Sequence, residues 1–346
     1  MVKSTFSKFV TGFAVGATMI AFSGLPAQAE TELTVYTAVE AEDLKRYAEM
    51  FNADHPDIKI KWVRDSTGIV TAKLLAEKDN PQADVVWGLA ATSLLLLKTE
   101  GMLEAYAPAG VEKLDPKFVD KSNPPAWVGM DAWVASVCYN TVEAAKANLT
   151  PPKTWKDLTD PKYKGHVIMP NPNSSGTGFL DVSSWLQMFG KDGGWSYMDG
   201  LHANIARYTH SGSKPCKLAA AGEIPIGVSF AFRGAKSKAA GAPLEIIVPD
   251  EGVGWDMEAT AIVAGTSKLD AAKTLVDWSI TKKANEMYNT GYAVVAMPGV
   301  AKPVEHFPAN LLEKMIDNDF EFAANNRAAI LKEWAKRYDS KSEPKG

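Results

Sequence analysis

The sequence lacks most of the features that place a protein on nucleic acid, in a membrane or around a metal. Its 37 lysines and arginines are balanced by 41 aspartates and glutamates, with no basic block and no acidic tail. This balance argues against nucleic acid or an anionic membrane as the main partner. After residue 25, no uncharged apolar run is long enough to span a bilayer. The two cysteines lack the spacing of a metal site.

The first residues have the pattern of a secretory signal. Lys3 and Lys8 precede an apolar, uncharged segment over residues 9–25, and Ala27-Gln28-Ala29 follows it. A positive start, a short apolar run and small residues at a cleavage site are typical of a signal peptide. We therefore predict a signal peptide over residues 1–29, cleaved near Ala29. An uncleaved membrane anchor is the alternative, and the short apolar run disfavours it.

The only cysteines are Cys138 and Cys216. In an exported protein two cysteines meet an oxidising environment, where a disulfide can form. Cysteine is also common as a small buried apolar residue. Both interpretations are compatible with the sequence, and a disulfide between the two is possible.

Strand and helix patterns alternate after the signal. Strand-like stretches are followed by amphipathic helical ones, a βαβαβ order that predicts a parallel, doubly wound sheet. The predicted strands are 33–37, 58–63 and 84–87, and the helices are 42–53, 71–77 and a leucine-rich stretch ending near 100. Ligands of such sheets bind beyond the carboxyl ends of the strands. Three loops meet that condition: 36–40, 65–68 and 87–91.

A second α/β unit follows a long apolar stretch. Residues 132–140 form an uninterrupted apolar run that suits a strand crossing between two lobes. Alternating elements continue from about 155 to 249, and a β-rich return segment covers 259–264. The sequence pattern then predicts one long helix over 268–289 and further helices from about 310 to 338. We therefore expect two α/β lobes rather than one domain.

One loop has the chemistry of an anion site. Residues 166–168 read as a strand, and 179–186 have the pattern of an apolar helix. Between them lie the hydroxyl residues Ser174, Ser175 and Thr177, with Gly176 and Gly178. A helix start offers unpaired N–H groups and a partial positive charge, which suits an anion. A capped helix start that binds nothing is the alternative. Nucleotide binding is disfavoured because no Walker lysine and no third glycine follow.

Several stretches together resemble periplasmic solute-binding proteins of ABC importers over the whole mature chain. They are 33–37, 84–87, 163–167, 175–177, 219–227 and 272–278. Within that class the sequence resembles the ferric-ion and phosphonate-binding cluster, and most of all the 2-aminoethylphosphonate-binding proteins. The resemblance implies a type II fold: two lobes, each a doubly wound mixed sheet, joined by crossing hinge strands. It predicts lobe 1 over 30–133 plus 262–305, lobe 2 over 134–261, and helices packing on the lobes over 306–346.

One departure from the iron-binding relatives affects the ligand. Those relatives carry two adjacent tyrosines where this chain has Phe232-Arg233, and a histidine where this chain has Glu40. A ferric ion needs anionic oxygen ligands, and neither Phe232 nor Arg233 supplies one. We therefore expect no metal and no cofactor.

The expected ligand has an anionic head and a cationic tail. Hydroxyl groups, backbone N–H groups and a guanidinium would bind a phosphonate, and carboxylates with aromatic faces would bind an ammonium. The phosphonate candidates are Ser66, Thr67, Ser174, Ser175, Gly176, Thr177, Ser211 and Arg233. The amine candidates are Tyr36, Glu40, Trp87, Trp255, Asp256 and Glu258. For each residue a structural role, as helix cap, surface ion pair, hinge packing or solvated acid, is the alternative.

The sequence thus predicts a periplasmic, monomeric binding protein and not an enzyme. It would capture 2-aminoethylphosphonate by lobe closure and deliver it to the membrane subunits of an ABC importer. Within the same fold, a ferric ion, a polyamine, thiamine or a phosphate ester is the alternative ligand. An exported hydrolase that uses Ser174 or Ser175 with a histidine is a further alternative, but no Gly-x-Ser-x-Gly elbow surrounds either serine.

Overall fold

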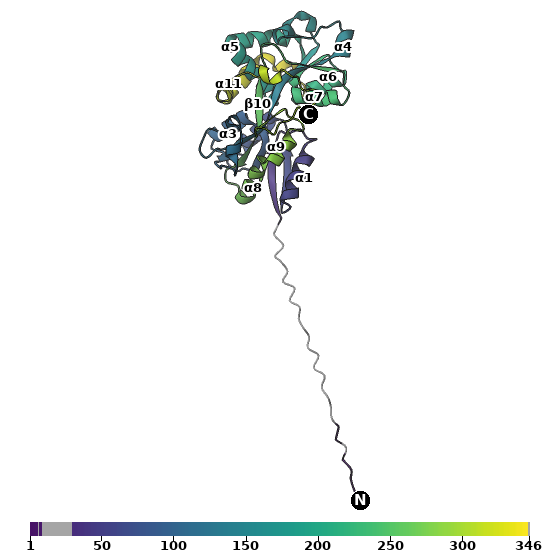
Figure 1. Ribbon diagram of the computed structural model, residues 1–346. Coiled ribbons are helices and arrows are strands. Elements are labelled where there is room, and N and C mark those ends of the chain that lie inside the picture. Colours follow the sequence, from purple (N-terminus) through teal and green to yellow (C-terminus); the bar gives the residue numbers. More distant parts are fainter. Residues whose placement is uncertain (6, 9–29, 345–346) are drawn as a thin grey trace.

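The computed structural model describes residues 1–5, 7–8 and 30–344. The apolar part and the cleavage site of the predicted signal peptide lie outside the described residues. No helix in the described part of the chain has both the length and the apolar character needed to cross a membrane. Two α/β lobes are stacked on each other (Figure 1).

Lobe 1 is built on the strands that come first in the chain. Their order is β2-β1-β3-β10-β5, with β1, β2 and β3 parallel and β10 antiparallel to its neighbours. The bounds are β1 Thr31–Thr37, β2 Ile58–Arg64, β3 Val85–Ala90, β10 Trp255–Val263 and β5 Val128–Asn140, with the short β4 Leu103–Glu104 and β11 Val294–Val295 at the side. The predicted βαβαβ order is therefore present.

Lobe 2 shares β5 with lobe 1. Up to Val134 this strand pairs with β10, and from Ala135 it pairs with β8 and β9. The remaining strands are β6 Val167–Pro170, β7 Ile205–Thr209, β8 Ile226–Phe230 and β9 Leu244–Ile247. All thirteen residues of β5 are buried, as a strand that runs through both lobes requires. The apolar run predicted to cross between the lobes does so.

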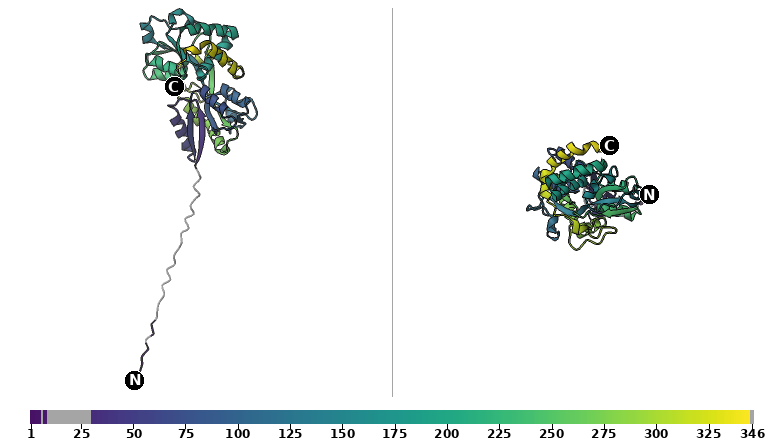
Figure 2. Two further views of the ribbon diagram at one scale, coloured as in Figure 1. Left: turned by 180° about the vertical axis from the view of Figure 1, so that it is seen from behind. Right: turned by 90° about the horizontal axis from the view of Figure 1, so that it is seen from above.

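Helices cover both sheets (Figure 2). Those of lobe 1 are α1 Leu44–Asp54, α2 Thr67–Ala76, α3 Ala91–Thr99, α8 Leu269–Ser279 and α9 Lys282–Tyr288. Those of lobe 2 are α4 Thr141–Lys146, α5 Gly176–Asn204, α6 Lys214–Ala220 and α7 Ala231–Ala239. The last two are α10 Leu311–Lys314 and α11 Phe320–Tyr338. Because α11 packs on both α3 and α5, it joins the two lobes.

Two details differ from the sequence prediction. The long helix predicted over 268–289 is divided into α8 and α9, because Thr281 starts a new helix and its hydroxyl accepts a hydrogen bond from the Ala284 N–H at 3.2 Å. The whole of β10 pairs within lobe 1, whereas the predicted boundary assigned its residues up to 261 to lobe 2. Hydrogen bonding between neighbouring strands, which no local pattern encodes, decides that assignment.

Candidate functional site

A cavity lies between the lobes, at the carboxyl ends of parallel strands of both sheets. Its volume is about 50 Å³, so the two lobes leave only a narrow space between them. All three loops predicted from lobe 1 contribute to it. The lining residues are Ala38, Glu40, Arg64, Ser66, Thr67, Gly88, Ala90, Trp133, Ser175, Gly176, Thr177, Ser211, Gly212, Ser213, Phe230, Glu258 and Tyr292.

Two helix starts, one from each lobe, meet at this cavity. Ser66 is the N-cap of α2 and Ser175 is the N-cap of α5. The Gly68 N–H donates to the Ser174 carbonyl at 2.9 Å, and a Cβ on Gly176 would lie 2.5 Å from Thr67 Oγ1. The first N–H groups of each helix have no partner within the helix. Both predicted hydroxyl turns therefore present donors to one space.

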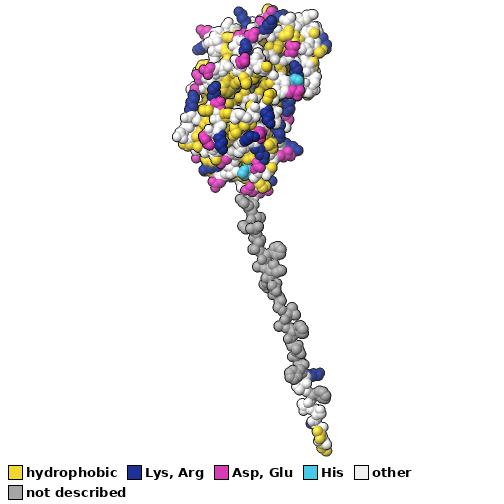
Figure 3. All heavy atoms as spheres, viewed as in Figure 1, with side chains coloured by type: hydrophobic (Ala, Val, Ile, Leu, Met, Phe, Trp, Pro, Cys, Tyr) yellow, Lys and Arg dark blue, Asp and Glu magenta, His cyan; other side chains and the backbone are white. Residues whose placement is uncertain are grey.

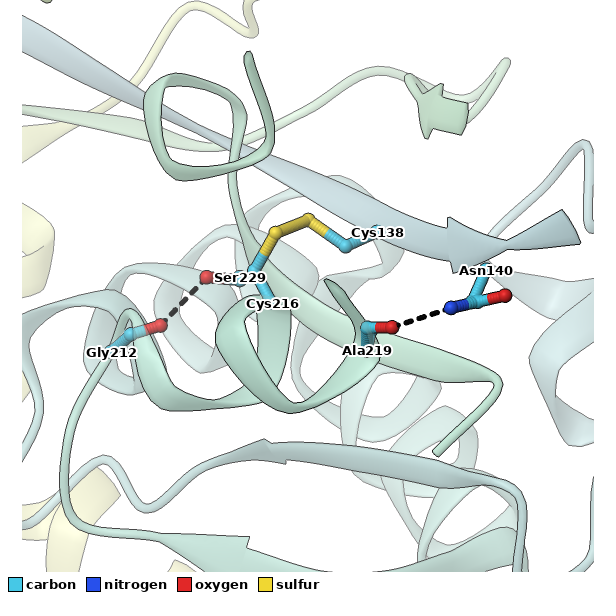
Figure 4. The surroundings of a disulfide bond; sticks show 6 residues. All are labelled: Cys138, Asn140, Gly212, Cys216, Ala219 and Ser229. Carbon is cyan, nitrogen blue, oxygen red and sulfur yellow. Dashed lines mark hydrogen bonds between the residues drawn. A yellow bond between two sulfur atoms is a disulfide. The ribbon is translucent and has the colours of Figure 1, made fainter. Parts of the chain in front are cut away.

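A third turn, Ser211 to Ser213, packs against the second. A Cβ on Gly212 would lie 2.5 Å from Thr177 Oγ1, so this turn needs glycine to come so close. Strand β8 fixes the position of this turn, because the Ser229 hydroxyl on β8 donates to the Gly212 carbonyl at 2.7 Å. Cys216 on the following helix α6 is disulfide-bonded to Cys138 on β5 (Figure 4). The disulfide thus anchors the helix that begins at this turn.

The cation of the cavity is Arg64, which the sequence analysis missed. It is the last residue of β2, two residues before Ser66, and it lines the cavity. Its Nε donates to the Val39 carbonyl at 3.0 Å, which leaves the two Nη groups for a ligand. Within the described residues, no carboxylate forms an ion pair with Arg64. The sequence could have indicated this role, because Arg64 stands at the carboxyl end of a parallel strand, just before the predicted ligand loop 65–68.

Arg233, the predicted cation, is engaged elsewhere. It lies on α7 of lobe 2, is 4% exposed and does not line the cavity. Its guanidinium donates across the cleft to Glu40 at 2.8 Å and to Glu42 at 3.0 Å. Both acids follow β1 in lobe 1. We call these two ion pairs, with the contact of Lys236 to Glu42, the interlobe latch.

The interlobe latch is pH-sensitive through Glu42. Burial tends to raise the pKa of this carboxyl, but the hydrogen bond from Lys236 and the charge of Arg233 outweigh it and lower the pKa to about 2. The ionised carboxyl therefore favours the closed form. This contribution is fully present above the ordinary pKa of 4.5 and is lost as the pH falls through about 2.

Removing the interlobe latch should open the protein. We expect Arg233→Met to increase the radius of gyration of the ligand-free protein in X-ray scattering, because the two hydrogen bonds that the guanidinium donates across the cleft are lost. Arg207→Met, which removes an exposed arginine from β7, is the control with the same change in charge. An unchanged scattering profile in Arg233→Met would show that the latch does not hold the lobes together.

Two acids line the cavity, Glu40 and Glu258. Glu40 is bound by the latch to Arg233. Glu258 lies on β10, accepts a hydrogen bond from the Tyr292 hydroxyl at 3.3 Å and is 8% exposed. Burial raises its pKa to about 8, although the Tyr292 hydrogen bond acts against this. The Glu258 carboxyl therefore carries its proton at neutral pH.

The remaining amine candidates lie outside the cavity lining. Tyr36 is 2% exposed and its hydroxyl donates to Glu77 at 2.9 Å. Trp87 is fully buried among aromatic rings of lobe 1, and its Nε1 donates to the Tyr288 hydroxyl at 3.1 Å. Neither side chain lines the cavity, so we leave both out of the proposed site.

Trp255 and Asp256 belong to the packing between β10 and the C-terminal region. Trp255 Nε1 donates to the Ile316 carbonyl at 2.9 Å. Asp256 accepts from the Thr92 hydroxyl at 2.7 Å, and burial raises its pKa to about 7 against that hydrogen bond. Neither lines the cavity, so their predicted contact with an ammonium group is also dropped.

Ser174 supports the site without lining it. Its Oγ lies 2.9 Å from His210 Nδ1, and His210 Nε2 lies 2.9 Å from the Glu343 carbonyl oxygen. Such a serine–histidine pair is the arrangement that the hydrolase alternative requires. However, Ser174 is 2% exposed and absent from the cavity lining, so a substrate in the cavity does not reach its hydroxyl.

No group of three or more His, Cys, Asp or Glu side chains in the described part of the chain could hold a metal ion. On the face drawn in Figure 3, hydrophobic side chains gather near the middle of the molecule, and charges of both signs are interspersed around them. That face carries no continuous basic patch. The polar groups that line the cavity are hydroxyls, helix starts, one guanidinium and two acids.

Comparison with known proteins gives three kinds of match. The sequence profile of a family described as "Bacterial extracellular solute-binding protein" matches residues 80–326. An uncharacterized protein of Haemophilus influenzae is 31% identical over 324 residues, which are 91% of this chain and 92% of the relative. The "Probable ABC transporter periplasmic-binding protein y4fP" of Sinorhizobium fredii is 30% identical, over 78% of this chain and 75% of the relative.

Three further matches carry ligands in their names or titles. A Salmonella typhimurium protein, named "Putative 2-aminoethylphosphonate-binding periplasmic protein", is 27% identical over 60% of each chain. The solved structure of AfuA from Actinobacillus pleuropneumoniae, with exogenous fructose-6-phosphate bound, has a TM-score of 0.84 at 31% identity. That match covers 90% of this chain and 99% of AfuA. Iron-bound HitA from Pseudomonas aeruginosa, at 19% identity and a TM-score of 0.74, shares the fold.

Proposed function

This chain belongs to the family of bacterial extracellular solute-binding proteins, and from that premise we propose that it captures a small organic phosphate or phosphonate. Proteins of this family are not enzymes; they bind small ligands outside the cytoplasmic membrane and deliver them to the membrane subunits of ABC importers. Its periplasmic neighbours by sequence and by fold agree with that role. The proposal concerns the ligand.

One observation carries the proposal: donors from both lobes converge on one space. The start of α2 in lobe 1 and the start of α5 in lobe 2 lie in contact, with Thr67 against Gly176. Arg64 adds a forked cation beside them, and a guanidinium suits the oxygens of a phosphate. A dianionic head held by both lobes would also hold the lobes together, which is how binding becomes closure.

The magnitudes support an anion as the main contact. Each charge-assisted hydrogen bond contributes roughly 1.5–3 kcal/mol, and each helix N-terminus about 0.3–1 kcal/mol. Four or five such bonds exceed the roughly 8 kcal/mol of a micromolar dissociation constant. The surplus offsets the lost freedom of the ligand and the cost of closing the lobes.

Two named ligands fit this class. 2-Aminoethylphosphonate, predicted from the sequence resemblance, is supported by the Salmonella relative and by the two acids that line the cavity. A sugar phosphate is supported by the likeness to AfuA, which extends over more of the chain. Both have a tetrahedral dianionic head, and they differ in the charge of the remaining atoms.

Calorimetric titration tests first whether the ligand is an organic phosphate or phosphonate, and then which of the two named ligands binds. We expect fructose-6-phosphate or 2-aminoethylphosphonate to bind with a micromolar or lower dissociation constant, and fructose and ethylamine, which lack the anionic head, to give no heat of binding. Putrescine, thiamine and ferric citrate serve as the competing ligand classes. Tight binding of any of these three, with no binding of either phosphorus compound, would contradict the proposal.

A further inference from the structure

A buried carboxyl forms part of the cavity wall. Glu258 is more than nine-tenths buried, and its Oε1 accepts the hydrogen bond from Tyr292. Its Oε2 is buried and has no hydrogen-bond partner within the described residues. A buried polar atom without a partner is rare in proteins. At the wall of a ligand cavity, it is a position where a ligand atom completes the hydrogen bonding.

The surroundings of Glu258 oppose a negative charge. Asp131 stands opposite Glu258 in the β5–β10 register, is fully buried, and neither of its carboxyl oxygens has a hydrogen-bond partner in the described part of the chain. Two carboxyls this close in an interior do not both ionise. The hydroxyls of Tyr47, Tyr288 and Tyr292 also surround the pair, and the hydrogen bond from Tyr292 lowers the pKa of Glu258. From other elements, Glu40 and Asp43 raise the pKa of Glu258, and Asp43 also raises the pKa of Asp131. Arg64 acts in the opposite direction.

We propose that Glu258 binds the ligand as a neutral carboxyl, donating its proton to an uncharged oxygen at the end of the ligand remote from phosphorus. This inference rests on the proposed function and narrows it. The ligand then carries a hydroxyl or carbonyl oxygen at that end. An ammonium group can occupy the same place only if Glu258 first releases its proton, so an amine-bearing ligand binds with proton release.

The pKa of the Glu258 carboxyl determines the pH range in which the inference can be tested. The pKa of Glu258 is raised to about 8, burial being the main cause, and burial together with the charge of Glu258 also raises the pKa of Asp131 well above its usual range. The donated proton is therefore present at neutral pH. It is lost as the pH rises through about 8.

The first experiment uses two phosphonates that differ in one group, 2-hydroxyethylphosphonate and 2-aminoethylphosphonate. Calorimetry at pH 7.5 in buffers of different ionisation enthalpy counts the protons exchanged on binding. With a pKa of about 8, Glu258 is roughly three-quarters protonated at pH 7.5. We therefore expect the amine to release roughly three quarters of a proton from Glu258 and the hydroxyl compound to take up roughly one quarter, a difference of about one proton. We also expect the hydroxyl compound to bind more tightly. Tighter binding of the amine without extra proton release would overturn the inference.

Two substitutions distinguish the effect of the Glu258 proton on binding from the effect of the shape of its side chain. Glu258→Gln keeps a donor, so affinity for the hydroxyl compound should stay within about threefold and affinity for the amine should fall at least about tenfold. Between pH 7 and 9, the ratio of wild-type to Glu258→Gln affinity for the hydroxyl compound should fall; this ratio cancels the ionisation of the phosphonate. Glu245→Gln, at an exposed position on β9 outside the cavity lining, is the matched control and should retain the proton release.

Each outcome has one meaning. A flat affinity ratio across that pH range, or proton release that persists in Glu258→Gln, would show that Glu258 is not the donor. Absence of binding by both phosphonates and by fructose-6-phosphate would instead overturn the proposed function, and the inference with it. The two failures are distinguishable, because the first leaves a measurable dissociation constant and the second does not.

Discussion

Gly68→Ala should weaken binding of the phosphorus-containing ligand by roughly 5- to 150-fold, the equivalent of about 1–3 kcal/mol of overpacking. Gly68 lies in the first turn of α2, and a Cβ there would come within 2.3 Å of the Asn173 carbonyl oxygen in lobe 2. That oxygen belongs to the backbone, so no side-chain rotation relieves the contact. The two helix starts then cannot meet, and the anion loses donors from one lobe.

The folded lobes should tolerate this substitution. Alanine favours a helix more than glycine does, and the contact exists only when the lobes are closed. We therefore expect an unchanged or slightly higher melting temperature for the ligand-free protein, and scattering that stays expanded when ligand is added. Gly193→Ala on α5 is the control, because its new Cβ would meet Phe189 at an ordinary 3.4 Å. Equal affinity in Gly68→Ala and wild type would show that closure does not bring these turns together.

Arg64→Met should have the largest effect on affinity. Removing a hydrogen-bonded charge from a partly buried pair costs about 2–5 kcal/mol, which is roughly 30- to 5,000-fold in the dissociation constant. Arg64→Lys keeps the charge but loses the fork, so its affinity should lie between those of wild type and Arg64→Met. The measurement is calorimetric titration with fructose-6-phosphate and 2-aminoethylphosphonate, which share the anionic head and should lose affinity by a similar factor.

The control for this prediction is a second arginine. Arg207→Met removes one positive charge from an exposed position on β7, and its affinity should change less than about threefold because the charge is distant and screened. If Arg64→Met and Arg207→Met behave alike, Arg64 acts through net charge and not through contact. Melting temperatures of both variants check that the hydrogen bond from Arg64 to the Val39 carbonyl is not needed for folding.

Local sequence patterns predicted the parts of the fold that local physics determines. The alternation of strands and helices in lobe 1 and the long apolar strand β5 follow from side-chain periodicity and burial, and both are present in the structure. The pairing of β10 with lobe 1 and the break at Thr281 were missed. The first depends on which strands become neighbours, and the second on a single capping hydroxyl within a continuous apolar pattern.

The same distinction holds at the site. The hydroxyl turns were predicted because a cap, its glycines and a helix start lie within a few residues of each other, and Ser66, Thr67, Ser175, Gly176, Thr177 and Ser211 all line the cavity. The choice between Arg64 and Arg233 could not be made in that way. It depends on Glu40 and Glu42, which reach Arg233 from the other lobe. Trp87 and Tyr36 are buried and lie outside the cavity lining, because the face of the sheet that each occupies could not be read from single residues.

A crystal structure with fructose-6-phosphate or 2-aminoethylphosphonate bound tests the central claim most directly. The account predicts that the oxygens on phosphorus lie within about 2.7–3.2 Å of donors from both helix starts, those of α2 and α5, and of the Arg64 guanidinium. It would be contradicted by a phosphorus atom bound by one lobe alone, or by a ligand whose anionic head points to solvent at the mouth of the cavity.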